Sequence, residues 1–261
     1  MKTKWKPNYL FVIAVLILTY LPILSLVIFS FNRERTLIRW TGFSFKWYLN
    51  LFNSPDIIEV VIVTLVIAVI STFISTCIGT FAAISLTKTK RALREIALQS
   101  NNIPIVNPEI VTAISFFLLF GALAMELGLL TMLIAHIGFS VPYVVITVYP
   151  KVKGLDPNLA DAAHDLGATP IQALFKVILP QIKVAIIAGA AIAFTMSFDD
   201  FIISYFALGS SGWQNISVYL YDLKRVDPTI NALSTLIILF IGTKIVLDYI
   251  KSNQNHKEED E

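Results

Sequence analysis

The chain has 261 residues, of which 56% are hydrophobic and only 15% are charged, and its mean hydropathy is +0.73. A soluble domain carries more charged residues, because its surface must face water. The composition therefore argues against a water-soluble enzyme or binding module and indicates a protein embedded in a membrane and its lipid. The net charge of +2 is close to neutral, so no nucleic acid partner is expected.

Uncharged segments long enough to cross a membrane recur along the chain. Residues 9–31 form 23 consecutive uncharged positions, and residues 60–87 form 28. A helix crosses the hydrocarbon layer, roughly 30 Å thick, in about 20 residues, so each segment is long enough to span. Four further apolar runs bring the prediction to six transmembrane helices: 110–125, 127–150, 184–198 and 228–243. We expect an all-α membrane protein with a single domain over residues 1–261.

The distribution of Lys and Arg predicts the orientation of these spans. If the N-terminus is cytoplasmic and the spans alternate, 14 of the 20 Lys and Arg residues lie on the cytoplasmic side. Cytoplasmic loops carry such an excess, so we expect both termini in the cytoplasm. The first outer loop opposes this trend, since it carries four of the other six: Arg33, Arg35, Arg39 and Lys46.

The third span differs from the others because a polar, proline-interrupted segment, residues 99–109, precedes it. If its helix begins near Arg94 and ends near Leu119, this segment lies inside the bilayer. Broken backbone at that depth is tolerated only where it is buried in protein or lines a watery cavity. In the alternative, the span begins at Ile110 and the segment is a cytoplasmic loop.

The cytoplasmic segment between the fourth and fifth spans, about residues 154–180, predicts two short helices. Asp156 is a candidate N-cap for the first helix, and Pro157 suits the first helical position, where its missing N–H is not needed. Gly167 is typical of the left-handed residue that ends a helix. We call this stretch the coupling segment.

The second predicted helix of the coupling segment begins at Thr169, where Gln172 completes a capping box, and is expected to end at Pro180. Each helix has an apolar stripe that suits either a groove on another protein or its own spans. The stripes are Leu159, Ala162, Ala163 and Leu166 in the first helix, and Ile171, Leu174, Phe175 and Ile178 in the second.

The spacing within the coupling segment resembles the EAA loop of ABC importer permeases. Asp161-Ala162-Ala163 is followed after three residues by Gly167, and after nine more by Val177-Ile178-Leu179-Pro180. Aspartate replaces the usual glutamate, and valine replaces isoleucine. The resemblance implies the type I ABC importer permease fold, with a helix pair that docks on an ATP-binding subunit. The residues it assigns to this coupling are Asp161, Ala162, Ala163, Gly167, Leu174 and Pro180.

No phosphate-binding loop of the form G-x-x-x-x-G-K-[ST] occurs in the sequence. We therefore expect a chain that is not an enzyme and holds no cofactor or metal, with ATP hydrolysed by a separate subunit. The resemblance implies as partners a second permease subunit, a dimer of ATP-binding subunits and an extracytoplasmic solute-binding protein.

Acidic residues near the fifth and third spans are the candidate substrate residues. An acidic side chain within a membrane costs about 2.5 to 3.5 kcal/mol on insertion scales, so it is a functional candidate. Asp199 and Asp200 end the fifth span, and adjacent helical residues point about 100° apart, so one carboxylate can face a pathway while the other contacts a neighbouring span. With Glu109 they suit a cation. In the alternative, the aspartate pair is simply wetted at the outer helix end.

Four short motifs resemble the spermidine/putrescine permeases: Ser197-Phe198-Asp199-Asp200, Asn107-Pro108-Glu109-Ile110-Val111, Phe45-Lys46-Trp47-Tyr48 and Asn231-Ala232-Leu233. This resemblance implies a polyamine pathway lined by Asp199, Asp200, Ser197, Glu109 and Trp47. Glu109 stands where the family often has aspartate. A lone loop tryptophan is also typical of an interfacial anchor, so two interpretations of Trp47 remain.

Three other functions are alternatives to this one. A permease for another small organic or inorganic solute satisfies the same motifs. A stand-alone secondary transporter is expected to have internal repeats and paired broken helices, whereas only one broken span is predicted here. An intramembrane enzyme needs a cluster of catalytic or metal-binding groups, and the three histidines are scattered. His136, in the fourth span, is predicted to be a packed, hydrogen-bonded residue, with a proton relay as the alternative.

Overall fold

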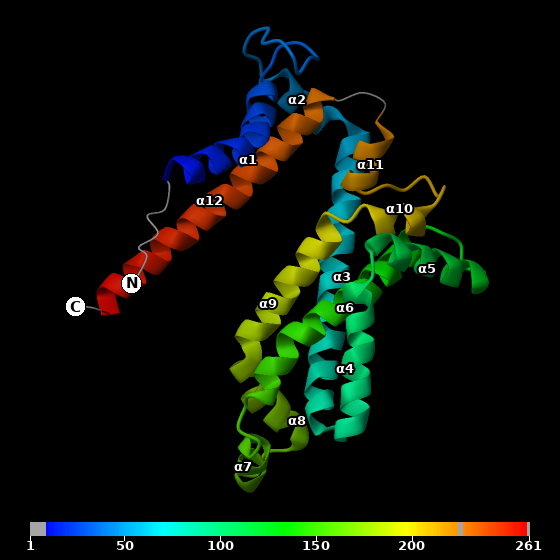
Figure 1. The fold of residues 1–261 in the computed structure, drawn as a ribbon, viewed down its shortest axis with the longest axis vertical. Coiled ribbons are helices and arrows are strands. Elements are labelled where there is room, and N and C mark those ends of the chain that lie inside the picture. Colours follow the sequence, from blue (N-terminus) through cyan, green and yellow to red (C-terminus); the bar gives the residue numbers. More distant parts are fainter. Residues whose placement is uncertain (1–8, 224–226, 260–261) are drawn as a thin grey trace, which may run out of the picture. The chain divides into compact units, whose positions relative to one another are not determined.

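The computed structural model describes residues 9–223 and 227–259, whose regular structure is helical (Figure 1). The all-α prediction is confirmed for this part of the chain. In chain order the helices are α1 (Tyr9–Phe29), α2 (Lys46–Asn53), α3 (Pro55–Lys88), α4 (Arg91–Val106), α5 (Glu109–Ala122), α6 (Leu129–Lys153), α7 (Leu159–Asp165), α8 (Pro170–Ala173), the π-helical η1 (Leu174–Ile178), α9 (Leu179–Phe198), α10 (Ile202–Leu208), α11 (Ile216–Asp222) and α12 (Pro228–Glu259).

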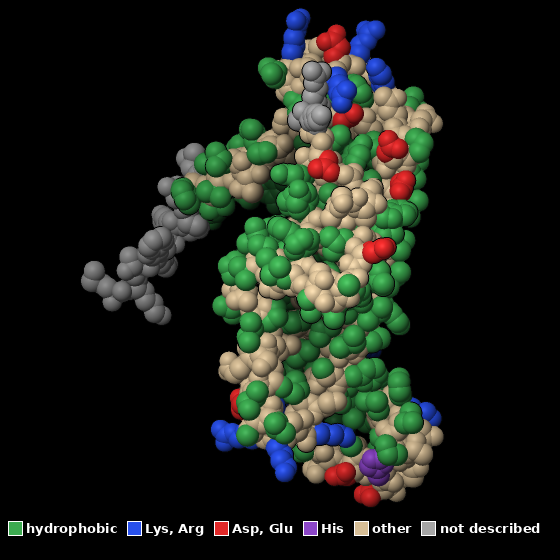
Figure 2. All heavy atoms as spheres, turned by 90° about the vertical axis from the view of Figure 1, so that its right-hand side faces the viewer, with side chains coloured by type: hydrophobic (Ala, Val, Ile, Leu, Met, Phe, Trp, Pro, Cys, Tyr) green, Lys and Arg blue, Asp and Glu red, His purple; other side chains and the backbone are tan. Residues whose placement is uncertain are grey.

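Four helical stretches in the described ranges are long and apolar enough to cross a membrane. They are Phe11–Phe29, Pro55–Lys88, Leu129–Lys153 and Pro170–Phe198. Helices α4 and α5 meet the same criteria together as a bent pair, and α12 contains a shorter apolar stretch, Pro228–Lys244. These elements lie where the spans were predicted, and the count of six stays a prediction. Figure 2 shows hydrophobic side chains gathered over the long helices.

The described residues divide into two compact units. The first contains those within 1–58 and 223–261, and in it α1 and α2 both pack against α12. The second contains residues 59–222, in which α6 packs against α4, α5, α9 and α10. The single domain over residues 1–261 stays a prediction.

The third predicted span is a helix broken at Asn107-Pro108. The residue before a proline is pushed towards extended backbone, and Asn107 has φ −70° and ψ 143°. Helices α4 and α5 are therefore bent by 106°. The side-chain amide of Asn101 donates to the carbonyl of Pro142, halfway along α6, at 3.2 Å. The polar segment is thus helical as far as Val106 and packs beside the middle of α6, and its position inside the bilayer stays a prediction.

The first helix of the coupling segment begins two residues later than predicted. Asp156 does not cap it: its carboxylate accepts from the backbone N–H of Asn158 at 2.9 Å, in a turn that precedes the helix. Asn158 then occupies the N-cap position, and α7 begins at Leu159. The predicted end is confirmed, because Gly167 follows α7 with a left-handed φ of +82°.

The second helix of the coupling segment has the predicted start but continues past the predicted end. Thr169 and Gln172 form the capping box, with backbone-to-side-chain distances of 3.0 and 3.3 Å. Pro180 does not end the helix, which runs without a break from Pro170 to Phe198. A proline ring crowds the carbonyl four residues earlier, and the wider π-helical turn η1, directly before Leu179-Pro180, relieves that crowding.

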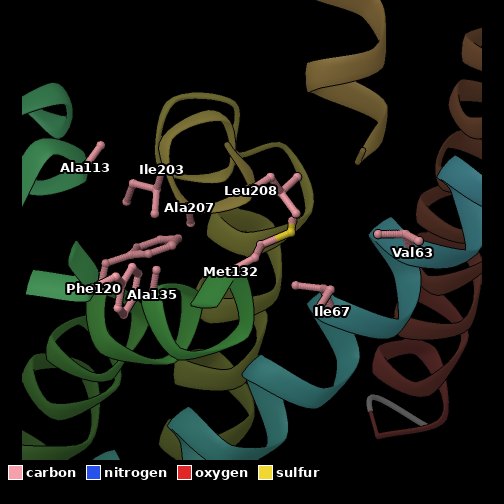
Figure 3. Close-up of a cluster of buried hydrophobic side chains, with 10 residues drawn as sticks. Val63, Ile67, Ala113, Phe120, Met132, Ala135, Ile203, Ala207 and Leu208 are labelled. Carbon is pink, nitrogen blue, oxygen red and sulfur yellow. The ribbon is translucent and has the colours of Figure 1, made fainter. Parts of the chain in front are cut away.

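Two clusters of buried hydrophobic side chains stabilise the second unit. The first joins α3, α5, α6 and α10; Figure 3 shows Phe120, Ala135 and Ile203 within it. Its members are Val63, Ile67, Ala113, Phe120, Met132, Ala135, Phe139, Ile203, Ala207 and Leu208. The second joins α3, α6 and α9 through Ala83, Ile84, Val144, Val148, Val152, Ile182 and Ala193. Helix α6 contributes to both clusters and is therefore central to the unit.

Gly79 permits the close approach of α3 to α6, and this predicts the effect of adding a methyl group. A Cβ at Gly79 would lie 2.6 Å from the Cβ of Val144, whereas a Cβ at Gly121 has no atom within 4 Å. We expect Gly79→Ala to lower the free energy of unfolding by about 1–3 kcal/mol. Gly121→Ala is the control, and helix propensity favours it by up to about 1 kcal/mol. Thermal unfolding in detergent measures both; equal stabilisation by the two substitutions would contradict the close approach.

Candidate functional site

A pocket of about 430 Å³ lies in the second unit, where α4, α5, α6, α9 and α10 meet. We call it the acidic pocket, because three of its lining residues are acidic and none is Lys or Arg. Its lining residues are Pro104, Asn107, Glu109, Thr112, Phe139, Tyr143, Met196, Asp199, Asp200, Phe201, Ile202 and Ile203. The three acids are those that the sequence analysis proposed.

Two breaks in helical backbone bring the three acids together. Glu109 is the first residue of α5, directly after the break at Asn107-Pro108. Asp199 is the C-cap of α9, and Asp200 follows it in the short connection to α10. The α9–α10 connection and the α4–α5 break thus both contribute to the wall of one pocket. Polar groups freed by broken helices are typical of substrate sites within membranes.

The two adjacent aspartates have different environments. Asp199 is exposed, whereas only 4% of Asp200 is exposed. One carboxylate oxygen of Asp200 accepts from the Ser204 backbone N–H at 2.7 Å and from the Ser204 hydroxyl at 2.6 Å. Its other oxygen accepts from the Ile203 N–H at 3.3 Å. Asp200 therefore caps the first turn of α10, while Asp199 remains available to the pocket.

A buried polar network continues from Asp200 into the neighbouring helices. His136 on α6 is fully buried; its Nδ1 lies 2.6 Å from the Ser197 hydroxyl, and its Nε2 lies 2.9 Å from the Ser204 hydroxyl. The same Nε2 is 3.3 Å from Asp200 Oδ2. Ser197 in turn is 2.9 Å from the hydroxyl of Ser71 on α3. The prediction of a packed, hydrogen-bonded histidine is confirmed.

Asn215 closes this network from the connection that precedes α11. Its side-chain amide donates to the Asp200 carbonyl and to the Ser204 hydroxyl, both at 2.8 Å. Its own carbonyl accepts from the Val218 N–H at 2.9 Å. Sequence reasoning missed Ser204 and Asn215, because neither belongs to a local motif. Tyr143 also lines the acidic pocket, and its spacing of seven residues from His136, about two helical turns, is a sequence signal that places both residues on one face of α6.

The electrostatics of the acidic pocket favour a cation. The carboxyl of Glu109 lies close enough to Asp200 and Asp199 to be repelled by both. No basic side chain lines the pocket to offset this charge. A ligand that carries positive charge and several N–H donors satisfies these carboxylates best, because charge-assisted hydrogen bonds are the strong ones.

The remaining two predicted pathway residues lie outside the pocket lining. Ser197 is 1% exposed and bonded to His136 and Ser71. Trp47, on α2 in the first unit, is 6% exposed, and its indole N–H donates to the Asn32 carbonyl at 2.6 Å. The substrate role of these two residues stays a prediction.

The coupling segment leaves large apolar side chains exposed. Leu166 is 89% exposed, Ile171 69% and Phe175 56%. Of the residues assigned to coupling, Ala163 is buried and Leu174 is half-buried, and the exposed ones are Asp161, Ala162, Gly167 and Pro180. The two predicted stripes are therefore only partly covered by the chain itself.

Comparison with known proteins identifies the family. A family model described as "Binding-protein-dependent transport system inner membrane component" matches residues 75–256. This chain belongs to that family. It is therefore a multi-pass membrane permease of the importer type, as the coupling segment indicated, and this supports the importer over a stand-alone secondary transporter.

Named relatives of the permease cover nearly the whole chain. The spermidine/putrescine transport system permease protein PotC of Haemophilus influenzae is 33% identical, over 94% of this chain and 96% of its own. PotC of Escherichia coli K12 is 36% identical, over 95% and 94%. The putrescine transport system permease protein PotI of the same strain is 36% identical, over 85% and 82%.

Solved structures confirm the permease fold. A bacterial ABC transporter involved in the import of the acidic polysaccharide alginate matches with a TM-score of 0.64 and 16% identity, over 90% of this chain and 91% of that one. The alginate ABC transporter in complex with its pentasaccharide-bound periplasmic protein matches with a TM-score of 0.62 and 17% identity, over 88% of each. At this identity the likeness establishes the fold alone.

The environment of Trp47 predicts a stabilising role for its indole N–H. Trp47→Phe keeps most of the buried ring but leaves the Asn32 carbonyl without this donor, so we expect a loss of about 1 kcal/mol in the free energy of unfolding. Trp40→Phe is the control, because Trp40 is 47% exposed. Thermal unfolding of the permease in detergent measures both; an unchanged Trp47→Phe variant would contradict this role.

Proposed function

We propose that this permease forms, with a second permease subunit, the pathway by which an ATP-driven importer moves polyamines, spermidine or putrescine, into the cytoplasm. The observation that carries the substrate class is the acidic pocket, with three carboxylates and no basic residue in its lining. The names of the PotC and PotI relatives support the same class. Residues 1–261 form one permease domain in the bacterial inner membrane, with both termini cytoplasmic.

The lining of the acidic pocket suits the chemistry of a polyamine. Such a molecule alternates ammonium groups with short methylene chains. Asp199 and Glu109 accept hydrogen bonds from the ammonium groups, while Phe139, Tyr143 and Phe201 provide aromatic surface for the methylene groups. Aromatic faces also attract alkylammonium cations directly. Another organic diamine of similar length meets the same requirements and is the alternative substrate.

The coupling segment is the proposed contact with the ATP-binding subunits. The exposed side chains of Leu166, Ile171 and Phe175 form an apolar surface of the kind that enters a groove on another protein. ATP is hydrolysed by a separate dimer of ATP-binding subunits, and an extracytoplasmic polyamine-binding protein delivers the substrate. The continuous helix from Pro170 to Phe198 connects this surface to Asp199.

Removing the free charges of the acidic pocket tests the substrate assignment. We expect Asp199→Asn and Glu109→Gln each to raise the KM for spermidine about tenfold, which corresponds to the loss of one charge-assisted hydrogen bond of about 1.4 kcal/mol. Uptake of labelled spermidine by membrane vesicles that carry the complete importer measures this. Glu126→Gln is the control, because Glu126 does not line the pocket. Vesicles of the unaltered importer that take up neither spermidine nor putrescine would overturn the polyamine assignment.

Truncating the apolar surface of the coupling segment tests the docking role. Leu166→Ser and Ile171→Ser should each weaken co-purification with the ATP-binding subunits, by about tenfold or more in affinity if they occupy the centre of the contact. Leu93→Ser, at the exposed start of α4, is the matched control. Both side chains are exposed in the isolated chain, so its thermal stability should not change. Undiminished co-purification in both variants would contradict the docking role.

A further inference from the structure

His136 lies at the centre of the buried network, and its hydrogen-bond partners determine which nitrogen carries hydrogen. The Ser204 hydroxyl has one hydrogen, which it donates to Asp200 Oδ2 at 2.6 Å. The same hydroxyl accepts from the Asn215 amide at 2.8 Å. Its remaining lone pair faces His136 Nε2 at 2.9 Å, so Nε2 must be the donor. The ring therefore directs an N–H towards the Ser204–Asp200 pair.

The other side of the His136 ring contacts the opposite side of the helix break. Nδ1 lies 2.6 Å from Ser197, in the last turn of α9, whereas Nε2 contacts Ser204, in the first turn of α10. Asp199 and Asp200 lie between these two serines in the sequence. One rigid ring on α6 thus joins both sides of the connection that carries the two aspartates.

We propose that His136 is a positioning residue of the acidic pocket: it clamps the α9–α10 connection, keeps Asp200 bonded within the wall, and leaves Asp199 and Glu109 to receive the substrate amines. The identity of those amines rests on the proposed function. The position of Asp200 does not, because it follows from the contacts of His136, Ser204 and Ile203.

Holding Asp200 in the wall affects which polyamine the pocket prefers. With Asp200 held in the wall, the pocket offers two free carboxylates, which match the two amines of putrescine. If His136 is replaced by a side chain that cannot reach both serines, the α9–α10 connection is no longer held from α6, and the Asp200 carboxylate can exchange its bonds to the start of α10 for a substrate amine. Spermidine has three amines and gains more from this third carboxylate than putrescine does.

Chemical labelling of carboxyl groups tests the position of Asp200 without any substrate. The complete importer, purified in detergent and monodisperse, is treated with a water-soluble carbodiimide and an amine, and fragment ions locate the label. In the unaltered protein we expect label on Asp199 and Glu109 but not on Asp200. His136→Gln should expose Asp200 to label, because a glutamine amide cannot bridge Ser197 and Ser204.

Two further variants keep the labelling test decisive. Ser204→Ala removes three contacts of the network, those with Asp200, His136 and Asn215, and should also expose Asp200, so the test does not depend on the folding of His136→Gln. Ser140→Ala is the control: Ser140 is fully buried one turn further along α6, and its hydroxyl has no hydrogen-bond partner among the described residues. Label on Asp200 in the unaltered protein, or its absence in both network variants, would overturn the proposal.

Substrate preference separates positioning from mere packing. In vesicles with the complete importer, His136→Gln should increase the ratio of the KM for putrescine to the KM for spermidine by up to about tenfold, the effect of one added ammonium–carboxylate contact. The double variant His136→Gln with Asp200→Asn should restore the ratio. A lower maximal rate for both substrates with an unchanged ratio would show that His136 only packs the core. If the unaltered vesicles take up neither polyamine, the proposed function fails, while the labelling result still decides the role of His136.

Discussion

The backbone at the end of α9 must satisfy its polar groups within the chain, and the acidic pocket depends on this requirement. Where a helix breaks inside a membrane, lipid cannot hydrogen-bond the freed N–H and carbonyl groups, so the protein itself or a water-filled cavity must satisfy them. Here the Asp200 carboxylate accepts from the first N–H groups of α10, and Asn215 donates to the Asp200 carbonyl. The break is therefore stable because one of two adjacent acids is committed to it. The carboxylate of the other acid, Asp199, lines the pocket and does not cap α10.

Much of this arrangement was predictable from local sequence. The apolar runs located the long helices, the capping residues Thr169 and Gln172 located the start of the second coupling helix, and Gly167 located the end of the first. The polar segment before Ile110 predicted a broken helix, because prolines interrupt helical hydrogen bonding and such interrupted backbone is not tolerated where it faces lipid. The three acids of the pocket were found because an intramembrane acid is rare and costly. Each of these features is encoded within a few residues.

Features that depend on distant residues were not predictable in the same way. The two aspartates are adjacent in the sequence, and their different roles are decided by His136 on α6 and by Asn215, fifteen residues further along. The start of α7 was misplaced because Asp156 and Asn158 both have side chains suited to capping, whereas Asp156 bonds to Asn158 in the preceding turn and Asn158, at the N-cap position, makes no side-chain cap hydrogen bond. Pro180 was expected to end a helix, but local widening to a π-helical turn accommodates a proline without a break. Local rules gave the possible outcomes there, and packing selected among them.

The continuity of the helix through Pro180 changes how movement reaches the pocket. A helix that ended at Pro180 would join the coupling segment to the fifth span through a flexible hinge, and this hinge would absorb a displacement of the coupling segment. The observed helix has 29 residues from Pro170 to Phe198, which is about 43 Å at 1.5 Å per residue. It carries the exposed Ile171 and Phe175 at one end, and Asp199 follows its other end directly. Because His136 ties that second end to α6, a shift of this helix must move Asp199 relative to Glu109 or distort the buried network. The spacing of Asp199 and Glu109 is therefore mechanically linked to the coupling segment.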